Sequence, residues 1–157
     1  MKLCLLCIGK TNVDFVQEAN EIYLKRLKHY IQTELEIIPE QKPWKKMKAS
    51  DRVKAEGHAI LDKLKPTDAV YLLDEKGKEY SSEGFSELLQ KRMNSGVNRV
   101  VFIVGGAFGF SETIYKTYPQ KISLSKMTFS HQMIRCFFLE QVYRAMTILR
   151  GEPYHNS

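Results

Sequence analysis

The stretch Val-Val-Phe-Ile-Val-Gly-Gly-Ala-Phe-Gly, residues 100–109, decides the fold. Its first half is an unbroken apolar run rich in β-branched residues, which predicts a strand that is buried on both faces of a sheet. The glycines that follow permit positive φ angles and a close approach of a ligand to the backbone. Their spacing is that of neither a dinucleotide fingerprint nor a phosphate-binding loop. The stretch therefore predicts a central strand that ends in a binding turn, with a purely structural turn as the alternative.

Strands and helices are predicted to alternate on either side of this stretch. Apolar runs predict further strands at residues 3–8, 34–38, 69–73 and 122–124. Periodicity and capping residues predict helices at 12–29, from Ser50 or Asp51, from Ser81 or Ser82, from Ser111, and at about 132–150. This alternation predicts one α/β domain, residues 1–157, with a mostly parallel sheet flanked by helices. Because ligands bind beyond the carboxyl ends of such strands, the turns after Leu73, Val104 and Leu124 are expected to meet.

Length and composition fit a single soluble domain. The chain has 157 residues, of which 43% are hydrophobic, enough for one core. Its apolar runs are far shorter than the roughly 20 residues of a membrane span. The N-terminal apolar stretch lacks a small-residue cleavage site, so it predicts a buried strand and no signal peptide. We therefore expect a cytoplasmic protein that does not associate with membranes.

The three cysteines, Cys4, Cys7 and Cys136, are too few and too scattered for a disulfide framework. Cys4 and Cys7 form a Cys-x-x-Cys pair, but on a strand these two side chains face opposite sides of the sheet. A structural zinc ion takes four ligands, and the sequence has no second pair. We therefore expect buried cysteines and no metal site.

The charge balance favours a polyanionic partner. The net charge is +6, from 24 Lys and Arg against 18 Asp and Glu. Basic residues concentrate at 41–48, where four lysines surround Trp44. Lysines contact phosphates, and an exposed aromatic ring stacks on bases, so this segment is a candidate RNA contact. A solvated loop is the alternative.

Polar groups in the last third of the chain are further candidates for a site. Arg135 and Arg144 occur among apolar residues, which is unusual unless they are paired, and Glu140 is a candidate partner. An ion pair with a purely structural role is the alternative. At the C-terminus, Tyr154 and His155 are candidates to cover a pocket, with a frayed tail as the alternative.

Several motifs occur together: Leu73-Asp74, Gly105-Gly106-x-x-Gly109, Leu124-Ser125-x-x-Thr128-x-x-His131, Arg135, Glu140-Gln141-x-Tyr143-Arg144-Ala145 and Gly151-x-x-Tyr154-His155. As a set they resemble the RlmH family, which belongs to the SPOUT class of methyltransferases. The likeness spans the whole chain and is most specific in the C-terminal half. The family usually has proline directly before the histidine, where this chain has Ser130, which adds a backbone donor.

The resemblance implies methylation of N3 of a pseudouridine in 23S rRNA, within the assembled ribosome and with S-adenosylmethionine as donor. It also implies a C-terminal trefoil knot, which the periodicity does not show, and a homodimer in which one subunit's tail lies near the other's cofactor. The implied cofactor positions are Leu73, Gly105, Leu124, Ser125, Lys126, Met127, Thr128 and Phe129. The implied catalytic positions are His131, Arg135, Arg144, Tyr154 and His155.

The sequence does not decide which residue is the general base, and two other functions are compatible with it. His131 and His155 are both candidates to remove the N3 proton, while Arg135 or Arg144 could stabilise the ring anion or hold a phosphate. One other function is a non-enzymatic RNA- or ribosome-binding module that uses residues 42–48. The other is an α/β domain for a flavin or a nucleotide, against which the lack of a phosphate-binding loop counts.

Overall fold

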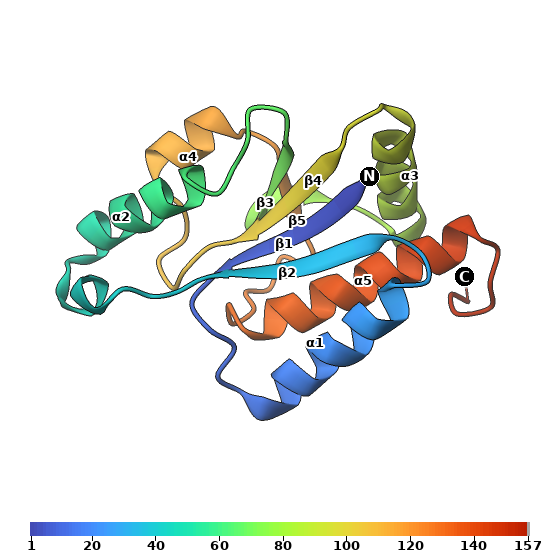
Figure 1. Cartoon of the computed structure of the whole chain (residues 1–157), viewed down its shortest axis with the longest axis horizontal. Coiled ribbons are helices and arrows are strands. Elements are labelled where there is room, and N and C mark those ends of the chain that lie inside the picture. Colours follow the sequence, from blue (N-terminus) through green and yellow to red (C-terminus); the bar gives the residue numbers. More distant parts are fainter. Residues whose placement is uncertain (157) are drawn as a thin grey trace.

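Five parallel strands form the sheet of the computed structural model, which describes residues 1–156. They are β1 (Lys2–Ile8), β2 (Gln32–Ile38), β3 (Ala69–Glu79), β4 (Arg99–Val104) and β5 (Lys121–Ser123). Their order across the sheet is β2-β1-β4-β3-β5 (Figure 1). The prediction of a mostly parallel α/β fold is confirmed, and the apolar run at 100–104 forms the central strand β4.

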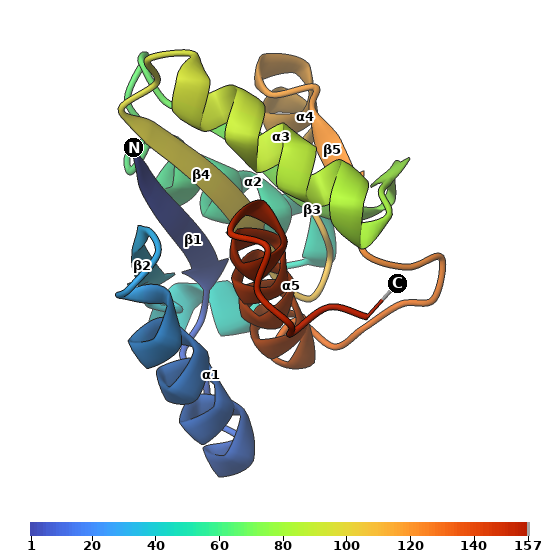
Figure 2. The ribbon, with the colours of Figure 1, turned by 90° about the vertical axis from the view of Figure 1, so that its right-hand side faces the viewer.

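Helices cover both faces of this sheet. On one face α5 (Met133–Leu149) packs between α1 (Asp14–Leu27) and α3 (Ser82–Asn94) (Figure 2). On the other face lie α2 (Ala49–Leu61), α4 (Glu112–Thr117) and the short 3-10 helix η1 (Lys42–Lys46). Among the described residues no helix is both long enough and apolar enough to cross a membrane.

Each face of the sheet has its own apolar core. Alternate residues of β1 point to opposite faces, so Cys7 packs with α5 while Cys4 packs with residues of α2 and α4. Both thiols are fully buried, and burial raises the pKa of each to about 12. The expectation of buried cysteines on opposite sides of a strand is confirmed.

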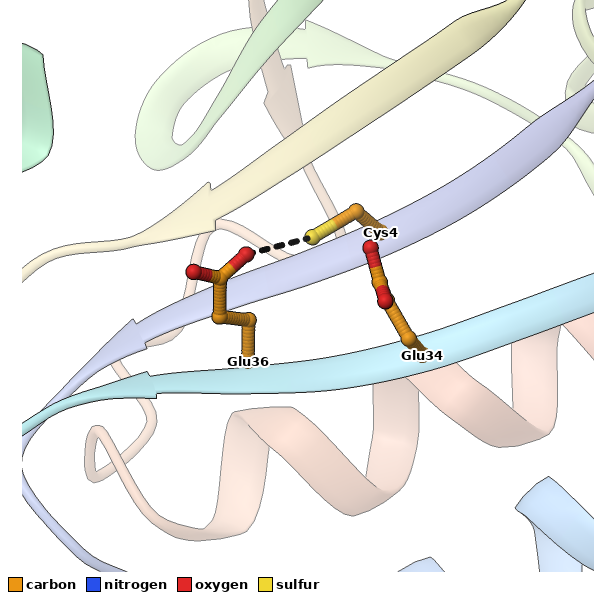
Figure 3. A group of neighbouring side chains, drawn as sticks. All are labelled: Cys4, Glu34 and Glu36. Carbon is orange, nitrogen blue, oxygen red and sulfur yellow. Dashed lines mark hydrogen bonds between the residues drawn. The ribbon is translucent and has the colours of Figure 1, made fainter. Parts of the chain in front are cut away.

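Two carboxylates lie beside the Cys4 thiol. Glu34 and Glu36 extend from β2 toward Cys4 on β1, and the Cys4 thiol is 3.9 Å from a Glu36 oxygen (Figure 3). Lysines already balance these carboxylates: Lys2 is 2.6 Å from Glu34 and Lys63 is 3.1 Å from Glu36. The group is therefore accounted for as ion pairs around a protonated thiol, without a bound cation.

Capping residues in the sequence predicted the starts of two helices correctly and that of a third incorrectly. The predicted caps Ser81 and Ser111 are confirmed, since each side chain accepts a backbone hydrogen bond from the first turn of its helix. The predicted start of α2 at Ser50 or Asp51 is wrong, because the helix begins at Ala49. Backbone bonds to the Lys48 carbonyl close its first turn without a side-chain cap, and Asp51 lies inside that turn.

The basic segment 41–48 is only partly as predicted. Its four lysines are exposed, but Trp44 is 3% exposed and packs in the core with residues of α2 and α4. The expectation that Trp44 stacks on a base is therefore wrong. The 3-10 turn of η1 directs this side chain inward, and burial of a large aromatic surface outweighs its exposure among lysines.

Candidate active site

A cleft of about 520 Å³ opens where the first half of β3 ends in a bulge and at the carboxyl ends of β4 and β5. Residues 73–76, 104–110, 122–125 and 127–131 line it, together with Tyr115 and Ile134. The three strand ends that the sequence predicted to meet therefore form one cleft, as expected of parallel strands.

One wall of the cleft is a bulge in β3, which continues past Leu73 where the sequence predicted its end. The pairing with β5 shifts register between Leu73 and Lys78. Asp74 in this bulge accepts hydrogen bonds from the Tyr115 hydroxyl at 2.6 Å and from the Lys76 N–H at 2.8 Å. Burial, followed by the Asp74 carboxylate, raises the pKa of Tyr115, so its hydroxyl stays protonated and donates. The bulge thus presents a fixed carboxylate to the cleft.

The glycine turn after β4 forms a second wall and folds back on itself. The Gly109 N–H donates to the Gly106 carbonyl at 3.2 Å, and these two residues form a short bridge. A Cβ atom on Gly105 would lie 3.1 Å from the Gly109 carbonyl oxygen and 3.3 Å from a ring carbon of Phe110. A side chain at residue 105 would crowd the turn, so glycine at this position lets the turn close tightly.

Hydroxyl groups hold the irregular segment after β5, which forms the third wall. Ser123 Oγ donates to the Ser125 carbonyl at 2.8 Å, and Ser125 Oγ accepts from the Met127 N–H at 3.0 Å. Thr128 Oγ1 donates to Glu75 in the bulge of β3. These bonds fix a backbone that has no helix or strand pairing of its own.

Ser130, which stands where the RlmH family usually has proline, joins this segment to α5. Its Oγ accepts from the Met133 N–H at 3.1 Å, and its carbonyl accepts from the Ile134 N–H at 3.1 Å. The hydroxyl thus supplies a local restraint of a different kind from a proline ring.

His131 lines the cleft where the segment meets α5. Its pKa is lowered, mainly because the ring is partly buried and also because the Arg135 guanidinium is close. A lowered pKa keeps the imidazole neutral at pH 7, so that it can accept a proton.

Arg135 is fully buried and does not line the cleft. Its guanidinium donates to the Ile8 carbonyl at 2.8 Å, to the His131 carbonyl at 2.9 Å and to Thr11 Oγ1 at 2.9 Å. Gln132 adds a second link, because its side-chain oxygen accepts from two N–H groups that follow β1. Arg135 therefore ties the histidine to the end of β1.

The other three predicted catalytic residues gather at the C-terminal tail. Arg144 pairs with Glu140 at 2.6 Å, and the Tyr154 hydroxyl donates to Glu140 at 3.1 Å. His155 has Nδ1 3.3 Å from Arg144 and Nε2 2.8 Å from Glu83. The predicted Glu140–Arg144 ion pair is confirmed, and it belongs to a larger network.

Aromatic packing orders the tail through residue 155. The Tyr154 ring packs edge-on against Tyr143, with centroids 4.8 Å apart, and the Arg144 guanidinium lies 4.7 Å from the Tyr154 ring centre. Burial raises the pKa of Tyr154, as do its contacts with Tyr23 and Glu140, so the hydroxyl stays protonated. Figure 2 shows the tail running back along α5.

A smaller cavity of about 190 Å³ adjoins the cleft, and none of the network residues lines either hollow. The two hollows share residues 122–124 and Phe129, while Phe137 and Gln141 of α5 line only the smaller one. The Phe129 and Phe137 rings contact each other, with centroids 4.9 Å apart. Within one chain, Arg144, Tyr154 and His155 therefore lie outside the cleft that holds His131.

The predicted cofactor positions mostly converge. All of them except Lys126 line the cleft. Sequence reasoning missed Glu75, Tyr115 and Phe108, which also line it. The polar residues after the strand at 69–73 were a signal for Glu75, whereas Tyr115 lies in a short helix that carries no motif.

The chain matches, over residues 1–155, the family model described as "Predicted SPOUT methyltransferase". It belongs to the SPOUT methyltransferase family, whose fold here places three strand-end segments around one cleft. The trefoil knot remains an expectation from the family.

Curated relatives of nearly equal length carry one name, ribosomal RNA large subunit methyltransferase H. The chain is 56% identical to the protein of that name from Flavobacterium johnsoniae, 53% to that from Christiangramia forsetii and 51% to that from Porphyromonas gingivalis. Each comparison extends over 156 residues and covers 99% of both chains. The resemblance to the RlmH family is thereby confirmed.

Proposed function

We propose that this chain transfers a methyl group from S-adenosylmethionine to N3 of a pseudouridine in 23S rRNA of the large ribosomal subunit. The observation that carries the proposal is the cleft between three strand-end segments in a chain of the SPOUT methyltransferase family. Relatives that are about half identical over their full length, and are named for methylation of large-subunit rRNA, support the substrate. Action on ribosomes would place the protein in the cytoplasm.

The residues of the cleft fit the proposed donor. The glycine turn and the segment after β5 both line the cleft, so their backbone N–H and C=O groups are available to a ligand there. Asp74 and Glu75 supply carboxylates that can accept hydrogen bonds from hydroxyl and ammonium groups. When bound, the donor supplies a methyl group on a positively charged sulfur, and this acidic wall favours positive charge.

Methylation of a ring nitrogen needs alignment of the reactants and removal of the N3 proton. His131 is the better placed base, because it is neutral and lines the cleft. The ring nitrogens of His155 are both engaged: Nδ1 accepts from Arg144, so Nε2 carries the proton and donates to Glu83. His155 therefore has neither an acceptor nor a donor left, and Arg144 is the cation of this network that is suited to holding an anionic group of the RNA.

We also propose a homodimer whose active site combines the cleft of one subunit with the Arg144, Tyr154 and His155 network of the other. These residues do not line the cleft of their own chain. Met127 beside the cleft is 77% exposed and Phe137 on α5 is 41% exposed. Large apolar side chains that are exposed on neighbouring segments are expected where a second subunit covers them.

Transfer of labelled methyl groups to large ribosomal subunits that lack the modification tests the proposed function. We expect incorporation from labelled S-adenosylmethionine, and nucleoside mass spectrometry should place the label on N3-methylpseudouridine. Subunits that already carry the modification are the control and should accept no label. Binding of subunits without incorporation would instead support the non-enzymatic RNA-binding module.

Substitution of His131 by alanine is expected to slow single-turnover methylation about 100-fold, the low end of the range for loss of a general base. The wild-type rate should fall as the pH falls, with a midpoint below the ordinary histidine pKa of 6.5, because the pKa of His131 is lowered and only the neutral ring accepts a proton. His58→Ala, at an exposed position on α2, is the matched control and should keep the wild-type rate. A wild-type pH profile in His131→Ala would remove His131 as the base.

A further inference from the structure

Phe108 is an exposed aromatic residue in the glycine turn that forms a wall of the cleft. It lies between Gly106 and Gly109, which close the turn, and 54% of its surface is exposed to solvent. Exposure of a phenylalanine gives up the free energy that burial of its ring would provide. A ring in this place therefore suggests a partner that covers it when substrate is bound.

Helix α2 holds this ring in position. The Arg52 guanidinium lies 5.7 Å from the centre of the Phe108 ring, within the range of a cation–π contact. Arg52 is itself fixed, because its Nε donates to Glu56 at 2.8 Å and its Nη2 pairs with Glu40. These bonds, that to Glu56 first, raise the pKa of Arg52. Phe108 is thus packed against an immobilised cation.

Glu56 also supports the turn from behind. It is 2% exposed, and its Oε2 has no hydrogen-bond partner among residues 1–156. A Cβ atom on Gly106 would lie 2.8 Å from the Glu56 carboxyl carbon, so the carboxylate fills the place of a side chain at that position. The Glu40–Arg52–Glu56 chain of charges therefore fixes both the backbone and the tip of the turn.

The surroundings of Phe108 favour a nucleic acid as the partner. Glu40 connects Arg52 to the start of the segment 41–48, whose four lysines are exposed. This segment and α2 lie at the same end of the sheet as the turn after β4 (Figure 1). Lysines attract phosphates, and an exposed ring beside them offers a face on which a base can stack. Trp44, the aromatic residue within the basic segment, is buried and cannot serve in this way.

We propose that Phe108 stacks on a nucleobase of the RNA substrate at the mouth of the cleft, and that Arg52 and Glu56 are positioning residues that hold its ring. The proposal rests on the proposed function, because it takes rRNA as the substrate. It assigns base contact to the glycine turn and phosphate contact to the lysines of 41–48. The turn then has two roles, one toward the methyl donor and one toward the RNA.

The test compares Phe108→Ala, Phe108→Leu and Phe108→Tyr on unmodified large ribosomal subunits and on a fragment of 23S rRNA. Because a stacked base contributes about 1–3 kcal/mol, Phe108→Ala should raise both the KM for subunits and the Kd for the fragment about tenfold. Phe108→Leu should bind RNA nearly as weakly as Phe108→Ala, since leucine keeps apolar volume but has no π face. Phe108→Tyr should bind RNA with an affinity close to that of wild type. The loss of affinity for S-adenosylmethionine should be smaller than the loss of RNA affinity, because the ring is proposed to face the RNA at the mouth of the cleft.

Two controls separate stacking from other effects. Phe15→Ala removes a ring on α1 that is 64% exposed and should leave RNA affinity unchanged. Lys46→Ala should reduce the salt dependence of fragment binding, whereas Phe108→Ala should weaken binding by the same factor at every salt concentration. Arg52→Lys keeps the positive charge but cannot bond to Glu40 and Glu56 at the same time, as the guanidinium does. It should therefore raise the KM for subunits and leave the salt dependence of fragment binding unchanged.

Several outcomes would overturn the proposal. Wild-type RNA affinity in Phe108→Leu would show that no aromatic face is needed. A loss of donor affinity equal to the loss of RNA affinity would place Phe108 in the donor site. Dissociation of Phe108→Ala into monomers would make it a subunit contact. Fragment binding is measured without catalysis, so wild-type protein that fails to methylate would reject the proposed function and leave this test intact.

Discussion

Replacement of Gly105 by valine is expected to lower the affinity for S-adenosylmethionine about 100-fold while the protein stays folded. A Cβ atom there would already lie 3.1 Å from the Gly109 carbonyl oxygen and 3.3 Å from a Phe110 ring carbon, and valine adds two methyl groups. The turn must open to relieve these contacts, and overpacking of this kind costs about 1–3 kcal/mol, which at its upper end corresponds to about 100-fold. Calorimetry with S-adenosylmethionine measures the change.

Gly84→Val is the matched control, because the nearest atoms to a Cβ on Gly84 are side-chain atoms at 3.4 Å or more. It should bind the donor like wild type. Unchanged donor affinity in a folded Gly105→Val protein would remove the glycine turn from the donor site.

Gly105→Val can also be used to test whether each active site is formed by two subunits. Gly105→Val damages the cleft, and Arg144→Ala damages the tail network, so each protein alone should have little activity at donor concentrations that do not saturate Gly105→Val. Random mixing gives half mixed dimers with one intact composite site each, and about a quarter of the wild-type activity should return. A mixture that stays inactive would place both parts of the site in one chain.

Replacement of Arg135 by methionine is expected to lower the free energy of unfolding by about 2–4 kcal/mol. The buried Ile8 carbonyl, the partly buried His131 carbonyl and the Thr11 hydroxyl lose their donor. Methionine roughly fills the volume and avoids burial of a charge, which limits the loss. For a chain of this length the melting temperature should fall by about 5–15 °C, and methylation should slow because His131 loses its attachment. Urea and thermal unfolding measure the stability.

Arg150→Met is the matched control, since Arg150 also donates to a backbone carbonyl, that of His29, but does so at the surface. Its effect on the free energy of unfolding should stay below about 1 kcal/mol. If Arg135→Met and Arg150→Met unfold at the same urea concentration, the buried hydrogen bonds of Arg135 do not contribute as described.

The strands were predictable because burial on both faces leaves a direct mark in the sequence. Residues 3–8 and 100–104 are uninterrupted apolar runs, and both form inner strands of the sheet. The helix starts at Ser81 and Ser111 were equally clear, since capping is a local interaction. Glu140 was recognised as a candidate partner for Arg135 or Arg144, and the structure pairs it with Arg144, four residues along the same helix.

The sequence did not reveal features that depend on distant parts of the chain. Two of the three acceptors of Arg135 lie in and after β1, more than 120 residues away, and no local pattern connects them to Arg135. Trp44 is surrounded by lysines in the sequence, yet the core around α2 and α4 covers it. The bulge after Leu73 arises from pairing with β5, which comes almost 50 residues later. The four residues that follow Leu73 are polar or small, so the sequence alone indicates the end of a strand there.

The links from Arg135 and Gln132 to the end of β1 also bear on how the protein matures. They join the end of β1 to the start of α5, which comes about 120 residues later in the chain, and the wall of the cleft that carries His131 lies beside these links. A nascent chain that has not yet produced α5 lacks this wall, whatever the state of its other strands. The wall that carries His131 is thus completed only after α5 has been added to the chain.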